Sequence, residues 1–164
     1  MTEQKNNEIL LRVLMVDDQA MVCEAVRRML EEQEDIDFCS LTDATQTIEK
    51  AEEFKPTVLL IDLIMPDIDG LTLVKFIRVK AELKDVPIIV LSSKEEAETK
   101  MRAFQLGAND YLVKLPDPIE VIARIKYHSN GFLNLQQRNA AEMALKKELD
   151  DASQYVISLF PEKL

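Results

Sequence analysis

The sequence predicts a doubly wound α/β domain with a five-stranded parallel sheet over residues 9–127, on two observations. Short apolar segments alternate with amphipathic segments along the chain, which is the element order of a sheet whose strands are connected by helices. The apolar segments are continuous and do not alternate with polar residues, which is typical of parallel strands covered on both faces. A chain of 164 residues, 47% of them apolar, is long enough to form one such core.

Five apolar segments are the expected strands, and each is about as long as a buried strand usually is. In chain order they are LLRVLMV at 10–16, IDFCSL at 36–41, TVLLID at 57–62, PIIVLSS at 87–93 and DYLVKLP at 110–116. Pro56 ends the helical segment before the third strand. Residues 1–8 are polar, precede the first strand and are expected to be disordered.

Amphipathic segments follow the first four strands and are the expected helices. In the first of them, apolar residues recur at three- to four-residue spacing from Met21 to Leu30, which predicts a helix over 19–32. The other expected helices are 43–54 with Thr42 as its cap, 71–80, and 95–106, which ends at Gly107.

A long helical segment follows Pro118, because no further proline occurs until Pro161. It predicts one helix, or two with a joint at Gly131, where glycine weakens a helix by about 1 kcal/mol. Six of eight positions at heptad spacing are apolar, which is typical of a coiled coil; these positions are Leu135, Arg138, Glu142, Leu145, Leu149, Ala152, Val156 and Leu159. A helix of ~40 residues is ~60 Å long, too long to be covered by one small domain. Residues 128–164 are therefore expected to form a helical linker that makes a homodimer and leads to an output domain absent from this chain.

The composition excludes several classes of partner. The formal net charge of −10 disfavours binding to nucleic acid or to anionic membranes, because both partners would carry the same sign. Cys23 and Cys39 are too few for a metal cluster or a disulfide framework, and His128 has no partner that the sequence identifies. There is no signal peptide and no apolar run of ~18 residues, so the expected location is the cytoplasm.

Polar side chains are expected at the carboxyl ends of four strands. They are Asp17 and Asp18 after the first strand, Asp62 at the end of the third, Ser92 on the fourth and Lys114 on the fifth. Open parallel sheets bind ligands at this edge, so these groups should converge in one crevice. Three adjacent carboxylates repel one another unless a cation neutralises them, and oxygen ligands without His or Cys favour a hard ion such as Mg²⁺.

These residues, in this order and approximate spacing, resemble the receiver domain of bacterial two-component response regulators over residues 10–127. The resemblance implies a flavodoxin-like fold with strand order 2-1-3-4-5. It also implies that Asp62 is the phosphoacceptor. Mg²⁺, for which Mn²⁺ can substitute, is then expected to be bound by Asp17, Asp18, Asp62 and the backbone carbonyl of Ile64.

The same resemblance implies the residues that respond to the phosphoryl group. Ser92 is expected to contact it, Lys114 to neutralise it, and Tyr111 to turn from an exposed to a buried position as the switch. One position departs from the family pattern, which often has proline directly after the lysine, because Leu115 here separates Lys114 from Pro116. A cis peptide bond is expected before Pro116, and its exact position relative to Lys114 is left open.

The expected function is that of a receiver that takes a phosphoryl group on Asp62 from a sensor histidine kinase or a phosphotransfer protein, with no catalytic output domain of its own. The tail DDASQYVISLFPEKL resembles the helix before metal-dependent serine/threonine phosphatase domains, which favours a phosphatase output. The segment GANDYLVKLPDPIEVIARIKYHS also resembles receivers that precede diguanylate cyclases.

Two other classes stay open beside the receiver. A small aspartate-dependent phosphatase usually has two aspartates that flank one residue, whereas Asp17 and Asp18 are adjacent. A pseudo-receiver would dock without being phosphorylated, and the complete set of site residues argues against it.

Overall fold

The structure is a computed structural model that describes residues 9–93 and 95–160. Five parallel strands form one sheet in the order β2-β1-β3-β4-β5, which confirms the predicted fold class and strand order. The strands are β1 Leu11–Val16, β2 Ile36–Leu41, β3 Val58–Asp62, β4 Ile88–Ser92 and β5 Asp110–Val113. The segment 1–8, expected to be disordered, and the tail residues 161–164 lie outside the described residues.

Five α-helices and one short 3-10 helix connect or follow the strands in the described part of the chain. They are α1 Ala20–Leu30, η1 Ala44–Gln46, α2 Thr47–Phe54, α3 Gly70–Val79, α4 Ala97–Gln105 and α5 Pro118–Ser158. The prediction of Thr42 as a cap is wrong. The Asp43 carboxylate accepts a hydrogen bond from the backbone N–H of Thr45 at 3.0 Å, so the 3-10 turn begins one residue later.

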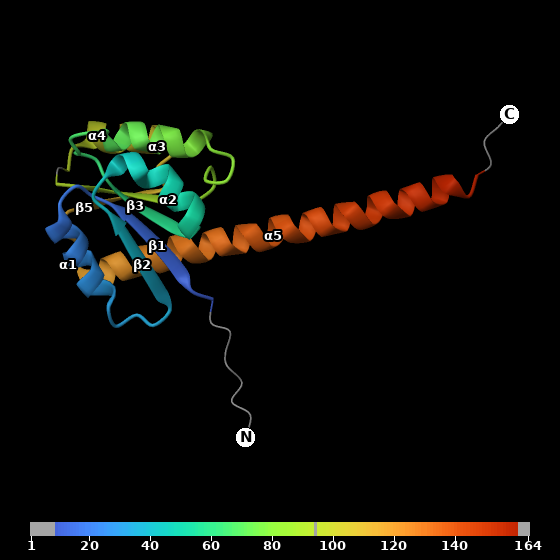
Figure 1. Ribbon diagram of the computed structural model, residues 1–164, viewed down its shortest axis with the longest axis horizontal. Helices are drawn as coiled ribbons and strands as arrows, with labels where there is room; N and C mark the ends of the chain where they lie inside the picture. The colour runs from blue at the N-terminus through green and yellow to red at the C-terminus, as the bar shows by residue number, and fades with distance from the viewer. Residues whose placement is uncertain (1–8, 94, 161–164) are drawn as a thin grey trace, which may run out of the picture. The chain divides into compact units, whose positions relative to one another are not determined.

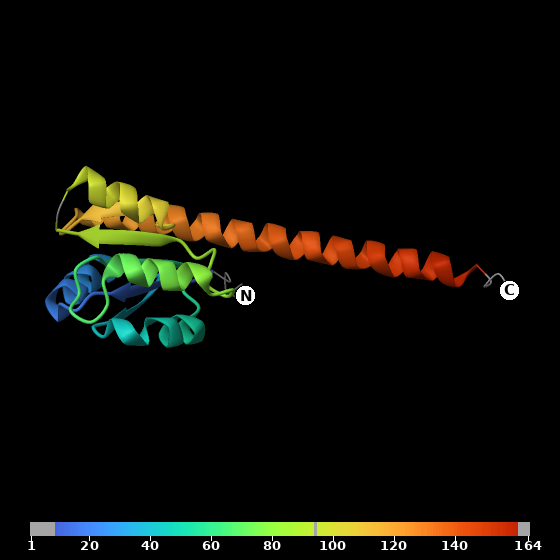
Figure 2. The same ribbon diagram turned by 90° about the horizontal axis from the view of Figure 1, so that it is seen from above.

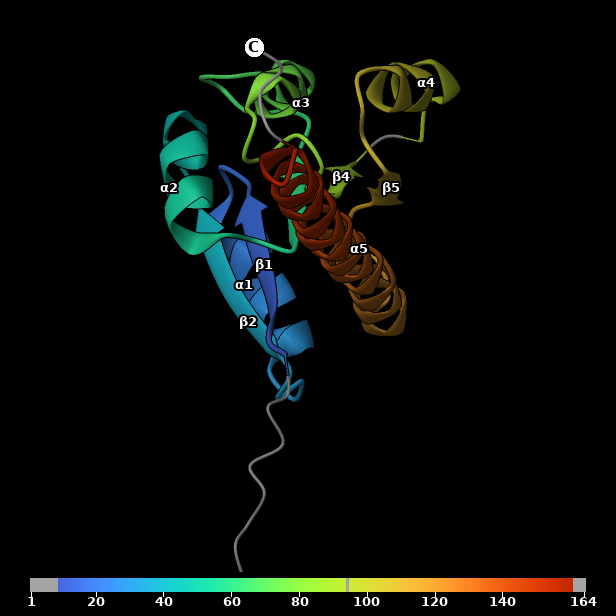
Figure 3. The same cartoon turned by 90° about the vertical axis from the view of Figure 1, so that its right-hand side faces the viewer.

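The helices cover both faces of the sheet, as continuous apolar strands require. On one face, strand residues such as Leu59 and Ile61 pack with residues of α2, α3 and α4. On the other face, Leu60 and Met15 pack with residues of α1 and the first part of α5. Figure 1 and Figure 3 show these helices on the two sides of the sheet. The site residues therefore stand on strands held from both faces.

Strand β1 lies at the point where the direction of the strand order reverses. It pairs with β2 on one side, where Val16 is opposite Leu41, and with β3 on the other, where Val16 is opposite Ile61. Strands β3 and β4 pair with Asp62 opposite Leu91. The carboxyl ends of β1 and β3 are therefore neighbours at this reversal, where ligands of open parallel sheets bind.

Helix α5 is a single helix of 41 residues that continues through Gly131 without a joint (Figure 2). Its first part belongs to the compact unit that ends at Phe132, and it buries Val121, Ile125 and Ser129 there. A second compact unit begins at Leu133. None of the described helices contains a stretch long and apolar enough to cross a membrane.

Candidate functional site

Asp17 is a buried carboxylate directly after β1. Its Oδ1 accepts a hydrogen bond from the backbone N–H of Gln19 at 2.9 Å, which shapes the turn into α1. Its Oδ2 is also buried, and Nζ of Lys114 lies 2.8 Å from it. A buried carboxylate favours a cation beside it.

Asp62 is the last residue of β3, and only 3% of its surface is exposed. Its Oδ1 accepts a hydrogen bond from the backbone N–H of Ile64 at 3.3 Å. Behind it, Gly70 starts α3 so close that an added Cβ would lie 2.2 Å from the Asp62 carbonyl oxygen and 2.6 Å from Cα of Leu63. The Gly70 N–H also donates to the Leu63 carbonyl at 3.0 Å, so α3 is held against the strand end. This position requires glycine because of a close approach between two backbone segments.

Lys114 follows β5 and joins the two buried carboxylates. Its Nζ lies 2.8 Å from Oδ2 of Asp17 and 3.0 Å from Oδ1 of Asp62. The Lys114 N–H donates to the Ser92 carbonyl at 2.8 Å, which continues the pairing of β4 with β5 to the site. The ammonium group thus lies between side chains from strands that are far apart in the sequence.

Burial and charge oppose each other at this site. Burial raises the pKa of the Asp62 carboxyl, and the nearby Asp17 charge raises it further. The contact with Lys114 lowers this pKa but does not offset the other two effects. Burial alone would lower the pKa of Lys114, but its contacts with Asp17 and Asp62 raise it. The lysine is therefore held charged, and Asp62 takes a proton more readily than an ordinary aspartate does.

The carboxylates fit a hard divalent cation. Oxygen atoms of Asp17, Asp18 and Asp62 all lie within 4.8 Å of one another, with Asp18 exposed and the other two buried. The set contains only oxygen donors, as Mg²⁺ prefers. The three aspartates predicted from separate segments are thus brought together as a group able to hold a metal ion.

The structure places the other predicted residues around this group. Ser92 is the last residue of β4 and is 2% exposed, and the backbone of Ile64 adjoins Asp62 while its side chain is 61% exposed. Tyr111 is 7% exposed, with Nζ of Lys100 5.3 Å from its ring centre. The Tyr111 side chain is therefore buried, and its rotation as a switch stays a prediction.

The cis peptide differs in position from the one expected before Pro116. It is the Lys114–Leu115 bond, and no other cis bond occurs in the described part of the chain. It directly follows the lysine, where the family often has a proline.

A second polar cluster, which the sequence did not reveal, ties β5 to α5. Oδ1 of Asp110 accepts hydrogen bonds from Arg124 at 2.6 Å and from the Tyr111 N–H at 2.8 Å, and its Oδ2 lies 2.8 Å from Nε2 of His128. His128 therefore does have a partner. Arg124 and His128 are four residues apart on one helix, and this spacing was the available signal that both could reach one acid.

We expect Asp110→Asn to lower the free energy of unfolding by about 2 kcal/mol at pH 7, because the ion pair with Arg124 is lost and the contact with His128 is disrupted at a mostly buried acid. Burial raises the pKa of Asp110, but bonds from Arg124 and His128 outweigh it and leave the pKa lowered. Its stabilisation is thus present above the unfolded value of about 3.9 and is lost as pH falls through the folded-state pKa.

Urea unfolding at pH 7 and at pH 3 measures this difference, with the exposed Asp37→Asn as control. A deficit of equal size at both pH values would contradict the assignment.

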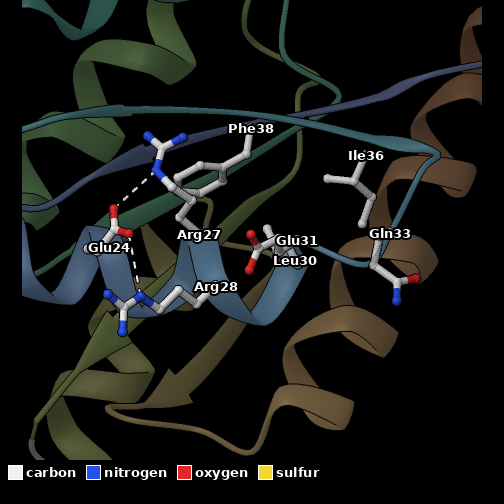
Figure 4. A pocket seen from close by; sticks show the side chains of 8 residues that line it. All are labelled: Glu24, Arg27, Arg28, Leu30, Glu31, Gln33, Ile36 and Phe38. Atoms are coloured by element: carbon white, nitrogen blue, oxygen red, sulfur yellow. Dashed lines mark ion pairs between the residues drawn. The ribbon is translucent and has the colours of Figure 1, made fainter.

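A separate cavity of about 550 Å³ lies between α1 and β2, and none of its lining residues belongs to the carboxylate group (Figure 4). Glu24 forms ion pairs there with Arg27 at 3.3 Å and Arg28 at 3.5 Å. The Arg27 guanidinium also lies 5.3 Å from the centre of the Phe38 ring. Glu24, Arg27 and Arg28 are thus paired with one another within the cavity wall.

Comparison with known proteins identifies the family. The sequence profile of the response regulator receiver domain matches residues 13–126. The chain is 34% identical over 140 residues to protein-glutamate methylesterase/protein-glutamine glutaminase 2 of Carboxydothermus hydrogenoformans, covering 84% of this chain and 35% of that protein. It is 36% identical over 118 residues to the transcriptional regulatory protein KdpE of Staphylococcus aureus, covering 70% of this chain and 48% of that protein. The chain thus spans less than half the length of these relatives.

Solved structures agree with this assignment. The Francisella response regulator 1452 receiver domain superposes with a TM-score of 0.67 at 28% identity, covering 73% of this chain and 97% of that one. The response regulator domain of Thermotoga maritima CheB superposes with a TM-score of 0.65 at 28% identity, covering 74% and 97%. The chain therefore belongs to the response regulator receiver domain family, a regulatory class of signal-transduction domain.

Proposed function

We propose that this chain accepts a phosphoryl group on Asp62 from a sensor histidine kinase or a phosphotransfer protein. The observation that carries the proposal is the placement of Lys114 within 3.0 Å of Asp62 and 2.8 Å of Asp17, in a group of three carboxylates able to hold a metal ion. A receiver needs a nucleophilic carboxylate and positive charge beside it, and this arrangement supplies both.

The transfer is a displacement at phosphorus. A carboxylate oxygen of Asp62 attacks the phosphoryl group of a phosphohistidine, the P–N bond breaks, and its electron pair stays on the histidine nitrogen, which then takes a proton. Lys114 is within reach to neutralise the phosphoryl oxygens, and Ser92 at the end of β4 is the residue we assign to contact them. Mg²⁺ held by Asp17, Asp18, Asp62 and the Ile64 carbonyl would supply further charge neutralisation when bound.

The direct test uses a small acyl phosphate as donor with Mg²⁺ present. Wild type is expected to gain the mass of one phosphoryl group, and Asp62→Asn is expected not to gain it. Asp67→Asn, which changes an exposed aspartate in the following loop, is the matched control and should behave as wild type. Phosphorylation of Asp62→Asn to the same extent as wild type would refute the proposal.

The same experiment separates the other classes. If wild type gains no adduct, the docking pseudo-receiver is the better explanation. If wild type rapidly hydrolyses many phosphomonoesters, the small aspartate-dependent phosphatase is the better explanation.

The proposal extends to what the receiver controls. Phosphorylation would bias Ser92 and Tyr111 and thereby the attachment of α5 to β5, where Asp110 binds both the Tyr111 backbone and two side chains of α5. We assign residues 9–127 to the receiver and 128–164 to a linker that forms a homodimer. This linker would lead to an output domain.

A metal-dependent serine/threonine phosphatase is the favoured output and a diguanylate cyclase the alternative. The support is the resemblance of the tail and of the segment around β5 and α5 described above. The relatives named here have other outputs, by name a methylesterase and a transcriptional regulator. What they share with this chain is the receiver.

A further inference from the structure

The second compact unit carries an exposed apolar face. Leu145, Leu149 and Val156 of α5, and Leu159 directly after its last residue, lie at heptad spacing. Between 51% and 63% of the surface of each of these residues is exposed. Ala152 completes this face and is also exposed. We call these five residues the apolar seam. Its spacing is that of core positions in a coiled coil, in which a second helix covers them.

Two opposite charges occupy the heptad positions directly before the apolar seam. Arg138 and Glu142 follow Leu135 in the same frame, and both are exposed. If a second helix covered this frame, the two charges would enter the core of the coiled coil. Charges at core positions reduce stability, but they select orientation and register when only one arrangement pairs them.

We propose that the helix forms a parallel, in-register dimer in which Arg138 of each copy pairs with Glu142 of the other. This inference rests on the homodimer that is part of the proposed function, and adds its orientation, its register and the residues that select them. In a parallel pair every core residue faces its own counterpart, so the layer with two arginines adjoins the layer with two glutamates. Each charge thus has an opposite charge one layer away.

Antiparallel arrangements fail on residues that can be named. An antiparallel pair centred on the charges would place the apolar seam opposite residues 121–135, where Val121 and Ile125 are already buried in the receiver unit. An antiparallel pair centred on the apolar seam would not bring Arg138 of one copy opposite Glu142 of the other. Only the parallel pair covers the seam and pairs the charges together.

Charge reversal tests the pairing. In Arg138→Glu, two layers hold four carboxylates, and we expect the dissociation constant of the dimer to rise at least about tenfold by sedimentation equilibrium. The double variant R138E/E142R exchanges the two charges and should return to within about threefold of wild type. Equal weakening in the single and double variants, or no weakening in either, would overturn the proposal.

Disulfide trapping tests orientation and register. Leu145 is a core position that faces its own counterpart in a parallel, in-register dimer but not in either antiparallel pair, so Leu145→Cys is expected to form an intersubunit disulfide under mild oxidation. Gln154→Cys, on the outer side of the helix, is the matched control and should not. Trapping equally at both positions, or at neither, would contradict this arrangement.

The outcomes distinguish this inference from the phosphoacceptor proposal. Phosphoryl transfer to Asp62 is read by mass on each variant and does not require a dimer. A wild-type chain that is phosphorylated but monomeric at every concentration would overturn the inference and leave the phosphoacceptor role intact. A chain that forms the expected dimer but gains no phosphoryl group would overturn the phosphoacceptor role and leave the inference about the dimer intact.

Discussion

Replacing Lys114 by methionine is expected to lower the free energy of unfolding by about 3 kcal/mol at pH 7 without divalent metal, the largest stability effect that we expect at the site. The side chain is 13% exposed and makes ion pairs with both buried carboxylates. Methionine retains most of the volume of the lysine side chain, so the decrease in the free energy of unfolding measures the effect of removing the charge. Asp17 and Asp62 would remain buried without a cation between them.

The pH dependence identifies this cause. The folded-state pKa of Lys114 is raised, so its stabilisation is fully present below the unfolded value of about 10.4, neutral pH included, and is lost as pH rises through the folded-state pKa. In Lys114→Met the deficit should shrink as pH falls toward 5, because Asp62, whose pKa is already raised by burial, takes up a proton.

Chemical denaturation at pH 7 and pH 5, each with and without Mg²⁺, measures these differences. The exposed Lys75→Met is the control and should have little effect. Added Mg²⁺ should restore part of the lost stability in Lys114→Met by placing a cation among the carboxylates. A deficit that neither acid nor Mg²⁺ reduces would mean that Lys114 stabilises the fold by packing and not by charge.

Gly70→Ala is expected to slow phosphorylation of Asp62 by on the order of 100-fold and to destabilise the fold by about 2 kcal/mol. The new Cβ would lie 2.2 Å from the carbonyl oxygen of Asp62, so α3 or the end of β3 must move. The obstacle is backbone, which cannot rotate away as a side chain can. A displacement of the Asp62 carboxylate by about 1 Å is enough to account for a loss of this size.

Gly131→Ala is the matched control for this substitution, because a Cβ there would meet nothing within 4 Å. It should leave phosphorylation unchanged and stabilise α5 by about 1 kcal/mol. Phosphorylation rates with an acyl phosphate donor and denaturation of both variants provide the comparison. If Gly70→Ala were phosphorylated at the wild-type rate, the close contact would not control the position of Asp62.

The sequence alone was sufficient to predict the fold class and the aspartates and lysine of the site. Its resemblance to a known family was sufficient to predict the strand order. The physical reason is that burial on both faces makes each parallel strand a continuous apolar run, and the carboxyl ends of parallel strands share one edge. Asp17 and Asp62 could therefore be predicted to meet although 45 residues separate them, and the structure brings their carboxylates within 4.8 Å.

The tertiary structure alone decided which side chains pair across elements. His128 and Arg124 meet Asp110 from another element, and the Thr57 hydroxyl donates to Oγ of Ser129 at 2.9 Å across 72 residues. The close approach of Gly70 to the Asp62 backbone is of the same kind. Periodicity reports only which face of a segment is buried. Which residue it meets there depends on how the helices dock on the sheet, and that is determined by the packing of the whole domain.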